Sequence, residues 1–275
     1  MALMAGSGPF GPRPAGSFNF EFEAPAHQLY LEPTSRRLRV VVDGEVIADT
    51  TSARVLHETG LLPVYYVPLK DVRPGALEPS QLRTHCPFKG DAAYFDVRVD
   101  GEVHADAVWT YPEPIAGCPA LAGLVSFDPR AVEIYEETER VVGHPRDPYH
   151  RVDAIASDRG VTVRFGGEVV ASSERPVLVF ETGLPMRTYL PAEDVRSEVL
   201  RPSDTATVCP YKGRTGRYHT IAVGDERAVD AVWVYEEPQP AVADIAGLLA
   251  FDDDQVEVEH HLDAFAPIAT TDGGG

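Results

Sequence analysis

Hydrophobic and polar residues alternate in short runs along much of the chain, which is typical of half-buried β-strands. The segment RVVVDGEVIAD (39–49) alternates on both sides of Asp43-Gly44, a pair that favours a tight hairpin turn. AAYFDVRVDGEVHADAVWTY (92–111) predicts two strands around Asp100-Gly101, and PVYYVP (63–68) predicts one short strand between prolines. Only PAEDVRSEVLRPS (191–203) has a helical pattern, for about two turns. The chain is therefore predicted to be mainly β.

The chain also repeats itself. HETGLLPVYYVPLKDV (57–72) resembles FETGLPMRTYLPAEDV (180–195) at an offset of 123 residues, and THCPFKG (84–90) resembles TVCPYKG (207–213) at the same offset. Farther on, the offset becomes 124, and DAVWTYPEP (106–114) matches DAVWVYEEP (230–238). This period suits a tandem pair of domains of ordinary size rather than a solenoid.

We therefore predict an all-β fold of two homologous, compact antiparallel β domains. Each is expected to have about seven or eight short strands and to form an open barrel or sandwich. The predicted organisation is a flexible leader (1–18), a first β domain (19–137), a linker (138–148), a second β domain (149–262) and a flexible tail (263–275).

Composition narrows the possible partners and location. The formal net charge of −19 disfavours nucleic-acid binding. Three cysteines do not form a disulfide framework and suit a reducing cytoplasm. No 18-residue apolar run predicts a membrane span, and residues 1–17 do not resemble a secretory signal. We expect a cytoplasmic monomer whose partner is a small molecule.

The motifs resemble a known family, the domain-of-unknown-function family 427. The resemblance rests on VRFGGEVVASS (163–173), FETGLPMRTYLPAEDV, TVCPYKG, DAVWVYEEP and AGLLAFDDDQVEV (246–258), together with their counterparts in the first repeat. The first repeat departs from the family pattern at Leu62-Pro63 and at His85. The resemblance implies a small, mostly β domain of the β-tent class. The family is sometimes labelled nucleotidyltransferase-like, but the chain has no Gly-Ser followed by an Asp-x-Asp metal pair.

The first candidates for chemistry are Cys86 and Cys209. Each precedes a lysine, Lys89 or Lys212, by three residues, and a nearby cation can lower a thiol pKa and supply a nucleophilic thiolate. Cysteine is also among the most buried residue types, so both thiols could simply pack in the core. The two lysines are the stronger candidates for ligand binding, because a lysine is harder to explain as packing.

Acidic residues recur at matching positions in both repeats. Glu58 and Glu181 could act as a general base or a substrate anchor, or could cap the turn at the following glycine. Asp106 and Asp230 begin Asp-Ala-Val-Trp, and strand alternation would place each aspartate beside a valine. A buried aspartate needs a partner, for which Lys89 or Lys212 is the natural candidate. We therefore expect a cluster of Glu, Lys, Cys and Asp within each repeat.

Aromatic residues and metal ligands complete the candidates. Trp109 and Trp233 are expected to anchor the core or to wall a pocket, as are Tyr66 and Tyr189. No Cys-x-x-Cys pair is present and no glycine-rich loop follows a strand, so no metal or cofactor is expected.

Three hypotheses follow for function. The first is binding of a small polar or anionic ligand in a pocket lined by Glu, Lys, Cys and Asp. The second is a transferase or hydrolase that uses a cysteine nucleophile or a glutamate base in the same pocket. The third is an interaction module in which the two domains imitate a homodimer through pseudo-twofold packing.

Overall fold

The structure is a computed structural model that describes residues 3–4, 6–21 and 25–262. The chain divides into two compact units, residues 1–150 and 151–275, and each is described by itself. The predicted tail, 263–275, lies outside the described residues. The described residues of the predicted leader form consecutive turns and bends.

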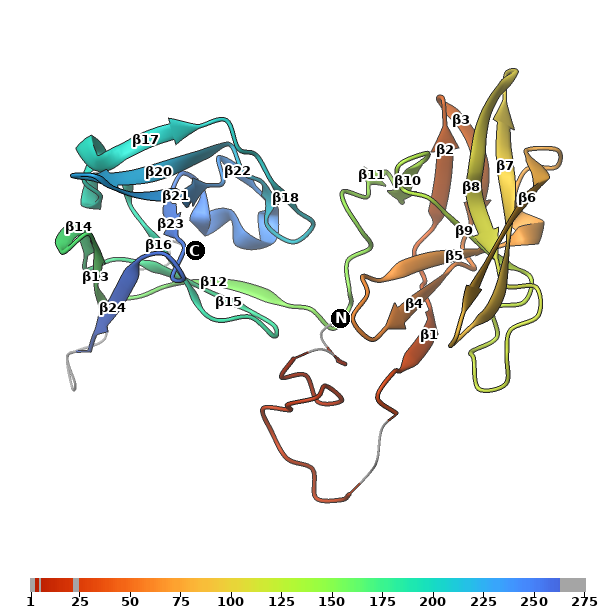
Figure 1. Cartoon of the computed structure of the whole chain (residues 1–275), viewed down its shortest axis with the longest axis horizontal. Helices are drawn as coiled ribbons and strands as arrows, with labels where there is room; N and C mark the ends of the chain where they lie inside the picture. The colour runs from red at the N-terminus through yellow and green to blue at the C-terminus, as the bar shows by residue number, and fades with distance from the viewer. Residues whose placement is uncertain (1–2, 5, 22–24, 263–275) are drawn as a thin grey trace, which may run out of the picture. The chain divides into compact units, whose positions relative to one another are not determined.

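The first unit is built almost entirely from strands (Figure 1). A seven-stranded sheet has the order β1-β4-β5-β9-β8-β7-β6, and a four-stranded sheet has the order β11-β10-β2-β3. One 3-10 turn, η1 (Leu69–Asp71), follows β5. The strands are β1 (Leu29–Pro33), β2 (Leu38–Val42), β3 (Glu45–Thr50), β4 (Arg54–Glu58), β5 (Val64–Pro68), β6 (Leu77–Cys86), β7 (Gly90–Val99), β8 (Glu102–Thr110), β9 (Leu124–Phe127), β10 (Glu133–Glu136) and β11 (Glu139–Arg140).

The second unit repeats this plan. Its large sheet has the order β12-β15-β16-β23-β21-β20-β17, beside two three-stranded sheets, β14-β13-β24 and β18-β19-β22. The strands are β12 (Val152–Ala156), β13 (Gly160–Phe165), β14 (Glu168–Ser173), β15 (Val177–Glu181), β16 (Arg187–Leu190), β17 (Leu200–Ser203), β18 (Val208–Cys209), β19 (Gly213–Arg214), β20 (Arg217–Val223), β21 (Glu226–Val234), β22 (Glu237–Pro238), β23 (Leu249–Phe251) and β24 (Glu257–His261). Three 3-10 segments are η2 (Ala192–Asp194), η3 (Ser197–Val199) and η4 (Pro240–Ile245).

The prediction of an all-β fold built from two similar halves is confirmed. The paired strands of the described residues run antiparallel, and their sheets do not close into a barrel. The predicted hairpins form at Asp43-Gly44 and Asp100-Gly101, where all four residues adopt the positive φ that such turns require.

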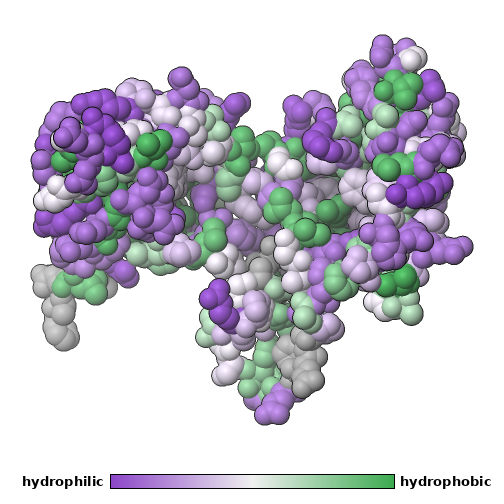
Figure 2. Space-filling view, viewed as in Figure 1, coloured by the Kyte–Doolittle hydropathy of each residue, from purple (hydrophilic) through white to green (hydrophobic). Residues whose placement is uncertain are grey.

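The large sheet of the first unit has a hydrophobic core on each face. Val55 and Tyr65 pack in one cluster, whereas their neighbours Leu56 and Tyr66 pack in the other. Successive side chains of a strand point to opposite faces, so this sheet is buried on both sides over β4 and β5. Hydrophilic residues cover much of the visible outer surface of both units (Figure 2). The cluster that contains Leu56 and Tyr66, which we call the second core cluster, borders the candidate site.

Three details differ from the sequence prediction. The units have eleven and thirteen described strands rather than seven or eight, partly because several are only two residues long. Residues 191–203 form two separate 3-10 turns and strand β17 rather than one helix, because Val195 between the turns makes an extended bridge to Ala171. Asp106 and Asp230 have φ of 54° and 55°, which interrupts the strand alternation on which their predicted orientation depended.

Candidate functional site

A buried ion pair joins two distant parts of the first unit. Lys89 Nζ donates a hydrogen bond to Glu58 Oε2, and both side chains are only 8% exposed. Glu58 is the last residue of β4, whereas Lys89 lies in the turn between β6 and β7. The predicted association of the Glu and Lys positions is therefore present in the fold, and its charges compensate each other.

The geometry of the turn that carries Lys89 requires a glycine at the next position, Gly90. Lys89 N–H donates to the carbonyl of Cys86 at 3.3 Å, and the Lys89 carbonyl accepts from Ile115 N–H at 3.2 Å. Gly90 has a φ of +100°, and a Cβ there would lie 3.3 Å from the Glu113 carbonyl oxygen. Glycine is required both for this backbone conformation and for the close approach of the 113–115 segment.

The second unit builds the same pair with the same spacing. Lys212 Nζ donates to Glu181 Oε2, with the two side chains 16% and 8% exposed. The Lys212 carbonyl accepts from Gln239 N–H at 3.0 Å, and Gly213 has a φ of +106°. In both units 31 residues separate the glutamate from the lysine. The recurrence of the glutamate and the lysine in both repeats therefore corresponds to one recurring ion pair.

His27 connects the first ion pair to the surface. Its Nε2 lies 3.0 Å from Glu58 Oε1, the carboxylate oxygen that Lys89 does not use. The pairing of Leu29 with Glu58 in the sheet brings His27 to this carboxylate. The imidazole stacks on Phe88, with ring centroids 3.6 Å apart and planes at 9°. Since an ionised carboxylate only accepts hydrogen bonds, Nε2 carries the proton in this arrangement.

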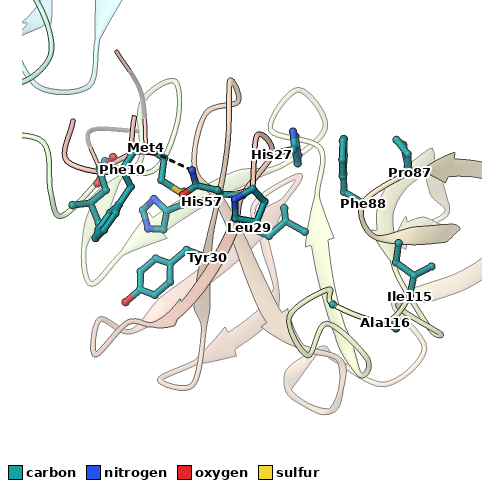
Figure 3. A pocket seen from close by; sticks show the side chains of 15 residues that line it. Met4, Phe10, His27, Leu29, Tyr30, His57, Pro87, Phe88, Ile115 and Ala116 are labelled. Atoms are coloured by element: carbon teal, nitrogen blue, oxygen red, sulfur yellow. Dashed lines mark hydrogen bonds between the residues drawn. The ribbon is translucent and has the colours of Figure 1, made fainter. Parts of the chain in front are cut away.

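A cavity of about 660 Å³ opens beside His27 (Figure 3). Its wall is mainly apolar, and it includes a second histidine, His57, whose Nε2 lies 2.8 Å from Glu32 Oε1. Neither His27 nor His57 has a hydrogen-bond partner at Nδ1 among the described residues. We call this cavity the histidine pocket; it is lined by Leu3, Met4, Phe10, Pro25, His27, Gln28, Leu29, Tyr30, His57, Pro87, Phe88, Ile115, Ala116, Gly117 and Asp147.

The predicted cysteines are half-buried. Cys86 packs at the edge of the core cluster that contains Tyr66, Tyr111 and Leu121, as does Cys118. Burial raises the pKa of the Cys118 thiol, and the nearby Lys89 opposes that effect only in part. All three cysteines, Cys209 included, are half-buried and free. Packing accounts for the position of Cys86, and its predicted role as a nucleophile, like that of Cys209, stays a prediction.

Asp106 and Asp230 do not join the lysines, so the predicted Asp–Lys pairing is wrong. The Ser80 hydroxyl donates to Asp106, and the Thr205 hydroxyl donates to Asp230 Oδ2 at 2.6 Å. Hydrogen bonding by Ser203, and then by Thr205, lowers the pKa of the Asp230 carboxyl. The positive φ of each aspartate turns its side chain away from the position that regular alternation predicts, and hydroxyl donors replace the lysine there.

The predicted tyrosines belong to a core cluster in each unit, and the predicted tryptophans pack against it. Tyr66 and Trp109 do so in the second core cluster of the first unit, and Tyr189 and Trp233 do so in the corresponding cluster of the second unit. Tyr66 is 1% exposed and Tyr189 is fully buried. Burial raises the pKa of both phenols, that of Tyr189 to about 12. Trp109 Nε1 donates to the Tyr66 hydroxyl at 3.3 Å, and Trp233 lies beneath the guanidinium of Arg187. Core packing therefore explains the two tyrosines, whereas the tryptophans lie at the edge of the cluster.

The histidines of the pocket were not among the candidate residues predicted from the sequence. His27 lies outside the quoted motifs, but the repeat offset of 123 aligns it with His150, and this recurrence was a usable signal. His57 has no such signal, because the second repeat has Phe180 in its place.

Two other kinds of site have no candidate in the part of the chain that the structure describes. No group of three or more His, Cys, Asp or Glu side chains there could hold a metal ion. No helix among these residues has the length and hydropathy to cross a membrane.

Comparison with known proteins agrees with the internal repeat. The model of a family described as a domain of unknown function, DUF427, matches the chain twice, over residues 30–138 and 153–261. None of the curated proteins matches the chain. Both matches contain a complete Glu–Lys pair, and together they cover most of the sequence. The chain therefore belongs to the DUF427 family and carries two copies of its domain in tandem.

Proposed function

We propose that the first unit binds a small organic molecule in the histidine pocket. The observation that supports this most strongly is the combination of an apolar cavity with two imidazoles, each fixed by a glutamate through Nε2. Ligand sites are commonly apolar hollows that contain a few well-placed polar groups, and a volume of about 660 Å³ lies within their usual range.

The ligand we propose is polar and carries a hydrogen-bond donor, such as a hydroxyl or an amine. With Nε2 protonated, Nδ1 of a neutral imidazole is an acceptor. An anionic ligand is the poorer fit, because Glu58 already neutralises Lys89 and the lysine does not line the pocket. The sequence predicted a polar or anionic ligand. We now propose a polar ligand that is either uncharged or cationic, and not an anion.

Calorimetric titration with three related probes tests this proposal: 2-naphthylmethanol, 2-naphthylmethylamine and 2-naphthoate. The alcohol and the amine should bind once per pocket, and the carboxylate should bind at least about tenfold more weakly. His27→Phe keeps an aromatic ring on Phe88 but removes the imidazole acceptor, so it should weaken the binding of the alcohol about three- to tenfold. His104→Phe, a change outside the pocket, is the control. Failure of all three probes to saturate, or equal affinities for wild type and His27→Phe, contradicts the proposal.

A second candidate is an enzyme that uses His27 as a general base. A histidine whose Nε2–H is held by a carboxylate is oriented for proton transfer at Nδ1. Glu58 itself is a poor base here, because Lys89 and His27 occupy its two oxygens. Hydrolysis of p-nitrophenyl acetate that is lost in His27→Phe and retained in Cys86→Ala would favour this candidate over the cysteine nucleophile.

The setting that we propose for this function is the cytoplasm. The three free thiols suit a reducing compartment. The net charge of −19 disfavours nucleic-acid partners, so we propose a small molecule as the partner.

A further inference from the structure

A second cavity of the first unit lies beside Trp109, away from the histidine pocket. Its volume is about 600 Å³, and its wall is formed mainly by apolar residues of β5, β9, β10 and the segment 140–145. The wall includes Val64, Trp109, Ser126 and Pro129. We call this cavity the tryptophan pocket. It shares no lining residue with the histidine pocket.

The second unit shows what lies on the equivalent tryptophan. The Arg187 guanidinium carbon lies 5.3 Å from the centroid of the Trp233 ring, so a flat cationic group covers the indole. Arg187 Nη1 donates to the Phe251 carbonyl at 2.9 Å and lies 3.2 Å from Asp253 Oδ1. An internal side chain thus occupies this position, and a carboxylate balances its charge.

The strand register shows which residues of the two units occupy equivalent positions. Trp109 pairs with Ser126, just as Trp233 pairs with Ala250. Val64 pairs with Leu56 at the start of β5, and Arg187 pairs with Val179 at the start of β16.

The first unit therefore has Val64 where the second has Arg187. By the offset of 124 that applies to this later part of the repeat, it has Pro129 where the second has Asp253. The first unit lacks both the side chain that covers the indole in the second unit and the carboxylate that pairs with that side chain.

We propose that the tryptophan pocket binds a flat, uncharged aromatic molecule that stacks on Trp109. The flatness follows from the planar group that covers the equivalent ring, and the absence of charge follows from the replacement of the Arg–Asp pair by Val64 and Pro129. Aromatic rings stack favourably in offset arrangements. The Ser126 hydroxyl supplies a hydrogen bond, since it lines the cavity and has no hydrogen-bond partner among the described residues.

The charged residues at the rim do not alter this assignment. Arg130 Nη2 lies 2.6 Å from Asp128 Oδ2, and Arg140 Nη2 lies 2.9 Å from Glu133 Oε1. Both arginine side chains are exposed, and each is matched by its own carboxylate. The pocket therefore offers neither an unmatched cation for an acid nor an unmatched carboxylate for a base.

Tryptophan fluorescence tests the proposal, because each unit contains one of the two tryptophans. In Trp233→Phe, Trp109 is the only indole, and coumarin, an uncharged flat lactone, should quench its emission saturably. In Trp109→Phe, the remaining Trp233 is covered by Arg187 and should show no saturable quenching. Coumarin-3-carboxylate should bind Trp233→Phe at least about tenfold more weakly than coumarin.

Two variants that introduce residues of the second unit complete the experiment. Ser126→Ala, which introduces the residue found at position 250, should weaken the binding of coumarin about three- to tenfold. Val64→Arg with Pro129→Asp recreates the internal ion pair and should abolish the quenching. His27→Phe should leave it unchanged, which separates this site from the histidine pocket.

Three results would overturn the proposal. These are absence of saturable quenching in Trp233→Phe, equal quenching of both tryptophans, and equal binding of the charged and uncharged probes. Circular dichroism verifies folding, and if the double variant does not fold, Ser126→Ala and the two single-tryptophan chains still decide the outcome.

Discussion

Replacement of Lys89 by methionine is the sharpest test of the buried ion pair. Methionine keeps an unbranched apolar stem, so the main loss is the charge that faces Glu58. Both side chains are only 8% exposed, and removal of one partner from a buried pair costs about 3–5 kcal/mol. His27 remains as a partner of Glu58 but does not occupy the same oxygen. The free energy of unfolding of the first unit should therefore fall by about 3–5 kcal/mol.

Two further lysines calibrate the result. Lys212 is 16% exposed, so Lys212→Met should cost less, about 1–3 kcal/mol, in the second unit. Lys70 is 81% exposed and lies 3.9 Å from Asp71, so Lys70→Met should change stability by less than about 1 kcal/mol. These three values should therefore follow the burial of the lysine.

Urea unfolding followed by tryptophan emission measures these changes unit by unit. Trp233→Phe isolates the transition of the first unit, and Trp109→Phe isolates that of the second. A loss for Lys89→Met no larger than that for Lys70→Met would refute the reasoning. The double variant Glu58→Gln with Lys89→Met should lose less than the sum of the two single changes, by about 1–3 kcal/mol.

Three other predictions concern single positions. Gly90→Ala should destabilise the first unit by about 1–3 kcal/mol more than Gly60→Ala in urea unfolding, because both have positive φ but only Gly90 has backbone within 3.4 Å of a new Cβ; equal losses would contradict the close approach. Burial lowers the pKa of His219, so its neutral form stabilises the fold fully above the unfolded value of about 6.5 and less as the pH falls through that value. His219→Leu should therefore flatten the decline in melting temperature between pH 7 and pH 5. A variant whose melting temperature depends on pH as the wild type's does would contradict this role of His219. Burial raises the pKa of Cys118, so iodoacetamide should modify it at pH 7 more slowly than free cysteine, as mass spectrometry of its peptide would show.

Local rules predicted the hairpins and the repeat, and both are present. Asp43-Gly44 and Asp100-Gly101 carry their turn conformation in their own sequence, so the alternating runs around them suffice. The segment 191–203 failed as a helix prediction because a tertiary bridge at Val195 outweighs its local pattern. Short segments of weak helical preference are often decided in this way by what lies beside them.

The candidate site was only partly predictable. Recurrence selected Glu58 and Lys89 correctly as neighbours, but not their link to His27, which depends on the register of β1 against β4. Asp106 was placed wrongly because an irregular φ interrupts its strand. Sequence periodicity assumes a regular strand, and a bulge breaks that assumption without a distinctive residue pattern.

The differences between the tryptophan regions also bear on how a chain with two similar halves folds correctly. Tandem domains of similar sequence are prone to exchange strands while they fold. A β16 strand that paired within the first half would place Arg187 beside Pro129 instead of Asp253, and would leave its charge without a partner. The reverse exchange would leave Asp253 facing Val64. Divergence at these two positions thus penalises mispaired intermediates, so restoring identity between the halves should increase misfolding during refolding even where each native half is unharmed.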